Sequence, residues 1–187
     1  MSTVITHKQF PNHRTYTMDL CGRPLTIDVG KVAELATASA MVSYGETTVL
    51  VAVTAAPRPR DGVDFFPLSV DFEEKLYAVG RIPGSFMRRE GQPSLPAVLA
   101  ARVIDRSIRP LFPYDFRNDV VVTCTVMSVD RDCSPEAAAM VGVSACLADV
   151  YKRQLQDHGV DLFHRDALVD ELVGVFLPVV VVLVQID

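Results

Sequence analysis

Residues 38–54 read ASAMVSYGETTVLVAVT, and this stretch decides the fold. It contains two apolar runs rich in small and β-branched residues, Ala38–Ser43 and Thr47–Thr54, joined by Tyr44-Gly45-Glu46. A short glycine-containing connection between two such runs predicts a β-hairpin. Because Thr47–Thr54 lacks charged side chains, we expect it to lie in the middle of a sheet.

Further strands are expected on both sides of this hairpin. Upstream, Thr15–Leu20 and Leu25–Val29 alternate in polarity around a turn at Cys21-Gly22-Arg23-Pro24. Downstream, Pro57–Gly62 is rich in proline and charge and should be a loop. Phe65–Phe72 then alternates again and predicts another strand.

The first predicted helix follows Ser94, a favourable N-cap residue, with Pro96 in its first turn. It should end near Arg109, because Pro110 follows. At 100° per residue its apolar side chains share one face that should pack on the sheet: Ala97, Ala100, Ala101, Ile104 and Ile108. Arg102, Arg106 and Arg109 fall on the opposite face, within about 60° of each other.

A second helix is predicted after one more strand. Asp119–Val129 is strongly β-branched, and Ser134-Pro135 is a typical helix start. The Ala/Met/Val-rich helix should run to about Asp149. A run of strands followed by helix, strand and helix predicts an α+β fold, in which helices cover one face of a mixed sheet.

Charge is distributed unevenly along the chain. The formal net charge of −5 over 187 residues does not suggest nucleic-acid binding. Between Val79 and Arg109, however, six arginines stand against Glu90 and Asp105, so this segment is +4 and the remainder is −9. A local basic patch can still attract polyanions, because screening limits each charge to a reach of about 10 Å.

The chain carries no targeting or membrane signal. Its four cysteines lack C-x-x-C spacing, so neither a zinc site nor a disulfide framework is predicted. Residues 1–10 lack the apolar core of a signal peptide. The longest apolar run, Val175–Val184, falls well short of the ~20 residues of a membrane helix. We therefore expect a cytoplasmic protein without membrane contact.

Val79–Ser94 carries the most informative pattern. Its glycines and prolines exclude a long helix or central strand and predict an ordered loop. Within it, Phe86 and Met87 stand beside Arg88 and Arg89. An aromatic ring can stack on a base of single-stranded RNA, and guanidinium groups can bind its phosphates. The arginines of the helix, Arg102, Arg106 and Arg109, could extend this track.

On spacing alone a second interpretation stays open. Phe86 and Met87 could anchor the loop on the domain, and the arginines could be solvated or paired with Glu90 and Asp105. Arg109 could also be a cation that neutralises the helix dipole.

Three stretches resemble the polynucleotide phosphorylase family: DFFPLSVDF at 64–72, GRIPGSFMRREG at 80–91 and IDRSIRPLFP at 104–113. Their order and spacing are similar to the first of that family's two RNase PH-like core domains, whose fold is of the ribosomal protein S5 domain 2-like type. The resemblance continues through Phe116-Arg117-Asn118-Asp119 to the helix near Ala148. Two positions depart from the family pattern, since Met87 and Ser107 stand where Phe and Pro are usual.

The resemblance implies a ring-shaped homotrimer that degrades single-stranded RNA from its 3′ end with inorganic phosphate, releases nucleoside diphosphates in mRNA turnover and can run in reverse as a polymerase. It implies that Phe86, Met87, Arg88 and Arg89 line a constriction that holds RNA. It also implies Mg²⁺ and phosphate sites chiefly in the second core domain, a helicase and an endoribonuclease as partners, and no catalytic residue or metal ligand in this chain.

Other candidate sites are weaker. Asp71, Glu73 and Glu74 could bind Mg²⁺ through oxygen ligands, but a solvated strand end explains them better. The four histidines make no ligand set, and Ser69, Ser85 and Ser94 have no nearby histidine that would suggest a nucleophile.

Residues 150–187 do not resemble the family. DVYKRQ at 149–154 is also one reading frame of a transposon-end adapter used in shotgun sequencing. We expect a family domain over residues 1–149 and hypothesise that the tail is a gene-model or adapter artefact. A divergent extension of the helix is the alternative.

Two functions compete on these grounds. The first is the RNA-guiding part of a phosphorolytic exoribonuclease, inactive as this chain alone. The alternative is a non-catalytic RNA-binding ring subunit. The single-domain relative RNase PH is disfavoured, because the phenylalanine–arginine loop belongs to the larger enzyme.

Overall fold

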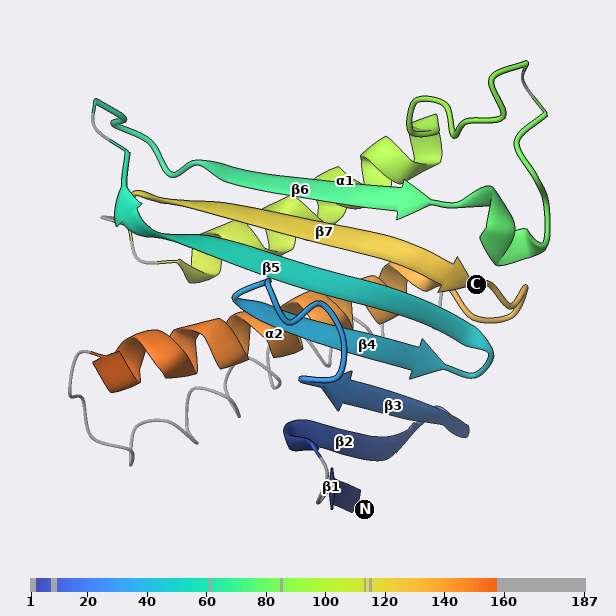
Figure 1. Ribbon diagram of the computed structural model, residues 1–187, viewed down its shortest axis with the longest axis horizontal. Helices are drawn as coiled ribbons and strands as arrows, with labels where there is room; N and C mark the ends of the chain where they lie inside the picture. Colours follow the sequence, from blue (N-terminus) through green and yellow to red (C-terminus); the bar gives the residue numbers. More distant parts are fainter. Residues whose placement is uncertain are drawn as a thin grey trace.

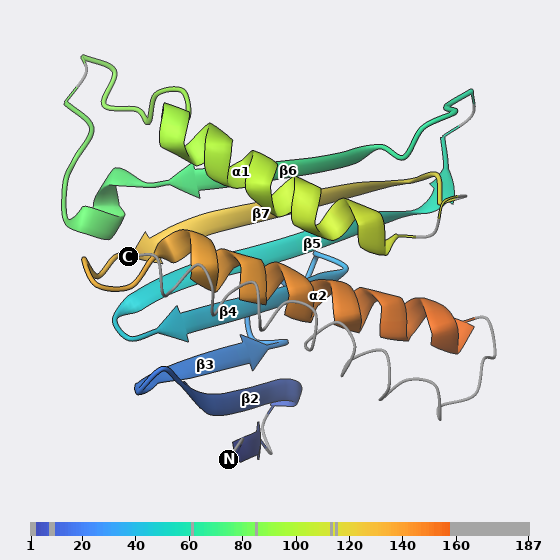
Figure 2. The same ribbon diagram turned by 180° about the vertical axis from the view of Figure 1, so that it is seen from behind.

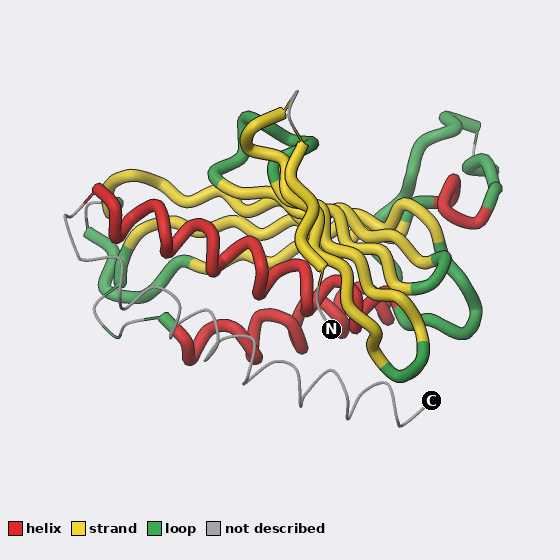
Figure 3. Tube along the Cα trace, turned by 90° about the horizontal axis from the view of Figure 1, so that it is seen from below, coloured by secondary structure: helices red, strands yellow, loops and turns green. Residues whose placement is uncertain are grey.

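The computed structural model describes residues 3–7, 10–60, 62–84, 86–112, 114 and 116–157. They form one seven-stranded sheet with two α-helices on the same face (Figures 1, 2 and 3). The elements are β1 (Thr3–His7), β2 (Phe10–Leu20), β3 (Arg23–Val29), β4 (Ala38–Tyr44), β5 (Thr47–Pro59), β6 (Leu68–Glu74), η1 (Leu76–Val79), α1 (Leu95–Ile108), η2 (Arg109–Leu111), β7 (Asn118–Ser128) and α2 (Pro135–Asp157).

The sheet is mixed, as the sequence predicts. Its strand order is β1-β2-β3-β4-β5-β7-β6, in which only β6 and β7 pair in parallel. The parallel pair is connected through α1, because neighbouring parallel strands need a crossover. The hairpin prediction is confirmed: β4 and β5 pair from Tyr44↔Thr47 to Ala38↔Val53. β5 lies inside the sheet, between β4 and β7.

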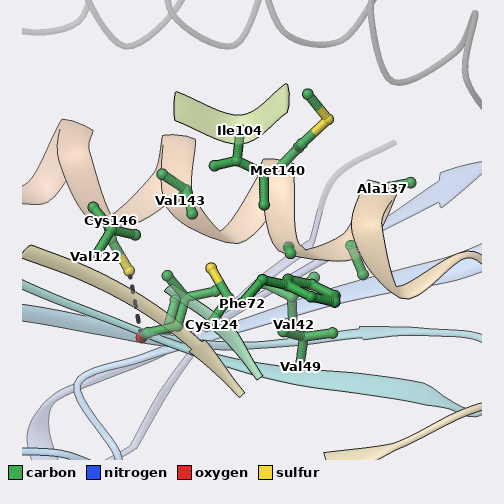
Figure 4. Close-up of a cluster of buried hydrophobic side chains, with 14 of the residues drawn as sticks. Val42, Val49, Phe72, Ile104, Val122, Cys124, Ala137, Met140, Val143 and Cys146 are labelled. Carbon is green, nitrogen blue, oxygen red and sulfur yellow. Dashed lines mark hydrogen bonds between the residues drawn. The ribbon is translucent and has the colours of Figure 1, made fainter. Parts of the chain in front are cut away.

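One face of the sheet forms the core with the two helices. Burial alternates along β4 and β5, so every second side chain points toward the helices. Figure 4 shows this core: Val42, Val49 and Val122 from the strands lie beneath Ile104 of α1 and Met140 of α2. The predicted apolar face of α1 is confirmed, since Ala97, Ala100, Ile104 and Ile108 are buried and Ala101 is half-buried.

Strand boundaries differ from the prediction at several places. β1 was not predicted, β2 begins at Phe10 rather than Thr15, and β3 begins at Arg23 rather than Leu25. Two further differences lie at prolines. β5 continues to Pro59, whereas Pro57–Gly62 was expected to be a loop. The β5–β7 register is irregular between Ala55 and Pro59, and an irregular ladder tolerates residues that lack an N–H. β6 begins at Leu68 rather than Phe65, because Phe66 packs instead with Phe112 and Phe116, at centroid distances of 4.6 and 5.4 Å.

The helices match the prediction at their first residues. Ser94 caps α1, its Oγ accepting from the Ala97 N–H at 3.2 Å, and α1 runs unbroken through Ser107. α2 begins at Pro135 as expected, but it ends at Asp157 rather than near Asp149. The remainder of the tail lies outside the described residues. None of the described helices is long and apolar enough to cross a membrane.

Candidate nucleic-acid interface

The loop between η1 and α1 stands away from the sheet at the end where β6 finishes (Figure 1, green). Apart from Ser85, which lies outside the described residues, residues 80–94 contain no strand and no helix. The prediction of a long loop at Val79–Ser94 is therefore confirmed, except that Val79 closes the one-turn helix η1. The loop ends where Ser94 caps α1 and donates from Oγ to Glu74 Oε2 at 2.7 Å.

The tip of this loop exposes the side chains that the sequence singles out. Phe86 is 101% exposed and Met87 is 65% exposed, so neither anchors the loop on the described part of the domain. Arg88 and Arg89 are exposed as well. No ion pair joins either arginine to Glu90 or to another described residue. The tip therefore presents an aromatic ring, a thioether and two guanidinium groups together.

Arg102 and Arg106 lie on the outward face of α1, as the helical periodicity predicts, and both are exposed. Neither makes an ion pair with a described residue. At 1.5 Å per residue they lie about 10 Å and about 16 Å along the helix from Leu95. Arg102 and Arg106 can thus contact a bound RNA strand only if that strand runs along α1, away from the loop.

The same face of α1 carries apolar side chains that the sequence interpretation missed. Leu95, Leu99 and Val103 are 73%, 53% and 51% exposed. These three residues are spaced four apart and interleave with Arg102 and Arg106. That spacing places them on one helix face and could have revealed them in the sequence. The outward face is consequently both basic and apolar, and apolar surface of this kind is typical of a contact with protein.

Arg109 is placed differently from the other predicted site residues. Its Nε and Nη2 donate to the Asp105 carboxylate at 3.1 and 2.7 Å. Nη1 and Nη2 also donate to the carbonyls of Phe66 and Leu68, at 3.2 and 3.3 Å, and the guanidinium lies 5.7 Å from the Phe66 ring centroid. This geometry favours the structural alternative, in which Arg109 fastens the end of α1 to the start of β6.

The carboxylates beside the loop do not form a metal site. Glu73 pairs with Lys75 at 2.7 Å, which raises the pKa of Lys75, and Glu74 accepts from Ser94. No group of three or more His, Cys, Asp or Glu side chains in the described part of the chain could hold a metal ion. The described residues therefore do not fit a resident Mg²⁺.

A cavity of about 530 Å³ lies at the base of the loop, between the end of β6, η1 and the start of α1. Glu73, Glu74 and Glu90 line it together with Val126 and Val129. These three carboxylates disfavour the binding of phosphate in the cavity, since like charges repel. The cavity instead leaves the returning part of the loop with little packing beneath it.

Histidines and cysteines supply no further site in the described residues. His13 is buried, with Nε2 3.2 Å from Asp28 Oδ1, while His158 and His164 lie outside the described residues. None of the four cysteines forms a disulfide, and only Cys21 is exposed. Burial, with a smaller contribution from Asp71, raises the pKa of Cys124 to about 12, so this thiol is not a nucleophile at neutral pH.

Residues 22–152 match the model of the 3′ exoribonuclease family, domain 1. The polyribonucleotide nucleotidyltransferase of Ruminiclostridium cellulolyticum is 58% identical over 135 residues, which cover 72% of this chain and 19% of that protein. The enzyme of the same name from Clostridioides difficile is 55% identical over 136 residues, 73% of this chain and 19% of its own length. The chain thus spans about a fifth of the length of the curated relatives it matches.

Solved structures include a more distant match. A chain of the Archaeoglobus fulgidus exosome, solved with RNA bound to the active site, aligns with a TM-score of 0.49 and 22% identity. The alignment covers 67% of this chain and 50% of that one.

Proposed function

Because the chain belongs to the 3′ exoribonuclease family as its domain 1, we propose that it is the RNA-guiding part of a phosphate-dependent 3′-to-5′ exoribonuclease. Its relatives at 55–58% identity bear the name polyribonucleotide nucleotidyltransferase, which supports this proposal. The reaction would release nucleoside diphosphates from single-stranded RNA in mRNA turnover.

The observation that carries the proposal is the exposed tip of the 80–94 loop. Phe86 can stack on a base, and Arg88 and Arg89 can each bind a phosphate by charge-assisted hydrogen bonds. Neither kind of contact reads the base sequence, because every base has a π-face and every nucleotide a phosphate. Sequence-independent binding of this kind suits an enzyme that must degrade RNA of any sequence.

We assign Arg102 and Arg106 to the same basic surface, since both are exposed and unpaired among the described residues. Arg109 was predicted to join them, but its four hydrogen bonds support a role in holding β6 and α1 together. Met87 is assigned an apolar contact with the RNA beside Phe86.

The chemistry is assigned to parts of the protein outside these residues. In this proposal Mg²⁺ and inorganic phosphate bind elsewhere in the intact protein, which acts in the cytoplasm as a homotrimer alongside a helicase and an endoribonuclease.

The RNA-binding role is tested by the double variant Arg88→Ala/Arg89→Ala in fluorescence-anisotropy titrations of labelled oligo(A). Loss of two charge-assisted contacts should weaken binding at least about tenfold. The matched control is Arg14→Ala/Arg58→Ala, which removes two exposed arginines from β2 and β5. Equal affinities of the two double variants would contradict the proposal.

The assignment of chemistry is tested separately. The chain incubated with poly(A), phosphate and Mg²⁺ should release no ADP, because the described residues contain no cluster of His, Cys, Asp and Glu side chains that could hold a metal ion. Phosphate-dependent release of ADP would show that a catalytic centre is present in this chain, and would overturn the division of labour proposed above.

A further inference from the structure

The main chain of Leu76 contacts both limbs of the 80–94 loop. Its carbonyl accepts from the Arg81 N–H at 3.0 Å, where the chain leaves the domain. Its N–H donates to Glu90 Oε1 at 3.0 Å, where the chain returns. We call Leu76, Arg81 and Glu90 the neck of the loop. The neck joins two positions nine residues apart, and the proposed RNA-binding tip lies between them.

The tip depends on the neck because little else holds it. Among the described residues of 82–89, no side chain makes a hydrogen bond or ion pair with the rest of the domain. A Cβ built on Gly84 or Gly91 would meet no atom within 4 Å, so no neighbouring side chain packs against the chain at either glycine. The cavity of about 530 Å³ lies beneath the returning limb.

The tip also contains a residue in a disfavoured conformation. Arg88 has φ +48°, in the left-handed region that non-glycine residues rarely adopt. Such a residue keeps its conformation only where the surrounding structure determines it. An Arg88 backbone released from the neck would relax to other conformations, and the guanidinium would then occupy many positions instead of one.

We propose that Glu90 is a positioning residue for RNA binding: its carboxylate holds the returning limb to the Leu76 N–H and thereby fixes the direction of Phe86, Arg88 and Arg89. This inference rests on the proposed function of the tip. Glu90 touches no RNA in this account. It acts through the geometry of the residues that do.

Electrostatics alone predicts the opposite effect for this residue. Glu90 lies next to Arg89 in sequence, and removing its negative charge makes the loop more basic. A more basic loop should attract RNA more strongly and bind it more tightly. The positioning role predicts weaker binding when the carboxylate is removed, so the sign of the change separates the two explanations.

The test compares three variants of the full chain in anisotropy titrations with labelled oligo(A). Glu90→Ala removes both charge and acceptor, and should weaken binding about threefold to tenfold, the range expected for the loss of one hydrogen bond of ordinary net strength. Glu90→Gln removes the charge but keeps an acceptor oxygen for the Leu76 N–H, and should bind as tightly as the unaltered chain or more tightly. Glu34→Ala makes the same charge change at an exposed carboxylate between β3 and β4, and should leave affinity unchanged.

A second readout needs no RNA. Trypsin cleaves after Arg88 and Arg89, and its rate at an exposed loop rises with the mobility of that loop. Glu90→Ala should accelerate cleavage at these two sites severalfold, measured by mass spectrometry at early times, whereas Glu90→Gln and Glu34→Ala should not. Thermal unfolding midpoints should stay alike, because the neck lies outside the core.

The outcomes separate this inference from the function it rests on. If Arg88→Ala/Arg89→Ala weakens binding but Glu90→Ala does not, or if Glu90→Gln loses as much affinity as Glu90→Ala, the positioning role of Glu90 is overturned and the proposed function stands. If the unaltered chain fails to bind oligo(A), or the arginine variant binds as well as it does, the proposed function itself is overturned. Faster cleavage of Glu90→Ala alone would then still identify the neck as the support of the loop.

Discussion

Thr47 shows how one buried hydroxyl connects distant parts of the chain. Its Oγ1 donates to the Cys133 carbonyl at 2.9 Å and accepts from the Asp130 N–H at 2.8 Å. Thr47 is fully buried at the start of β5, and its two partners lie in the connection between β7 and α2. The hydroxyl therefore satisfies a buried main-chain carbonyl and a partly buried main-chain N–H.

We predict that Thr47→Val destabilises the domain by about 1–3 kcal/mol, although valine has the same shape and a higher β propensity. The reason is that a buried carbonyl and a partly buried N–H lose their partner. Urea unfolding followed by circular dichroism measures the change. Thr54→Val, at an exposed position of the same strand, is the control and should stay within about 0.5 kcal/mol of the unaltered chain.

Cys124 gives the domain a defined sensitivity to alkali. Burial raises the pKa of this thiol to about 12 in the folded chain, against an ordinary value of 9.0. Below pH 9.0 the thiol keeps its proton in both the folded and the unfolded chain, and the difference between the two pKa values does not change the stability. Above pH 9.0 the unfolded chain releases a proton that the folded chain keeps, so stability falls as pH rises toward 12, with a slope of up to about 1.4 kcal/mol per pH unit.

The variant Cys124→Ala should lose this part of the alkaline destabilisation. It should be less stable than the unaltered chain near neutral pH, because alanine leaves a small cavity, and the difference should narrow above pH 9.0. Urea unfolding at about pH 8 and about pH 10.5 measures both values. A difference that stays constant between the two pH values would contradict the role given to burial of this thiol.

At the scale of elements, the approach of α2 to the sheet depends on Gly142. A Cβ at this position would lie 2.7 Å from Val51 Cγ2 and 2.9 Å from Val42 Cγ2, two stiff β-branched side chains of the core. Only a residue without Cβ lets the helix lie this close to β4 and β5. Cys146, one turn further along, donates from Sγ to the Val51 carbonyl at 3.8 Å (Figure 4).

Gly142→Val should destabilise the domain by about 2–3 kcal/mol, because overpacking a tight core typically costs this much and valine brings little helix propensity. Gly142→Ala should cost less, since the better helix propensity of alanine offsets the clash by about 1 kcal/mol. Chemical unfolding of both variants checks the order. A valine variant as stable as the unaltered chain would show that α2 can move away from the sheet without loss.

The sequence predicts those elements that are determined by residues close together in the chain. The β4–β5 hairpin and the buried face of α1 follow from periodicity, and both predictions are confirmed. The predicted C-terminal end of β5 and the predicted start of β6 were wrong, because they depend on a register irregularity and on the packing of Phe66 against Phe112. These are contacts between segments far apart in the chain, and no local pattern records them.

Some residues of the candidate site could be predicted from the sequence, and others could be recognised only from their contacts. The composition of the loop suggested Phe86, Met87, Arg88 and Arg89, and the structure adds that these side chains are exposed. Glu90 could not be recognised as part of the neck, because its partner is a main-chain N–H fourteen residues away, and such a group has no signature in the sequence. Arg109 resembled its neighbours Arg102 and Arg106 in spacing and differs from them only through its contacts.

In the whole molecule, one side of the sheet is covered by both helices (Figure 3). Val121 and Met127, on the strands, are exposed. The basic segment lies at the end of β6 and along α1, in a chain whose net charge is negative. RNA attracted to this molecule should therefore meet the loop and α1, and be repelled by most of the remaining surface.

The salt dependence of RNA binding reports whether the loop tip contacts phosphates. For single-stranded RNA, each phosphate neutralised by a cationic side chain contributes about 0.7 to the slope of log affinity against log salt concentration. Arg88→Ala/Arg89→Ala should therefore flatten the slope by about 1.4 or more relative to the unaltered chain. A slope unchanged by the double substitution would contradict the claim that the loop tip binds RNA phosphates.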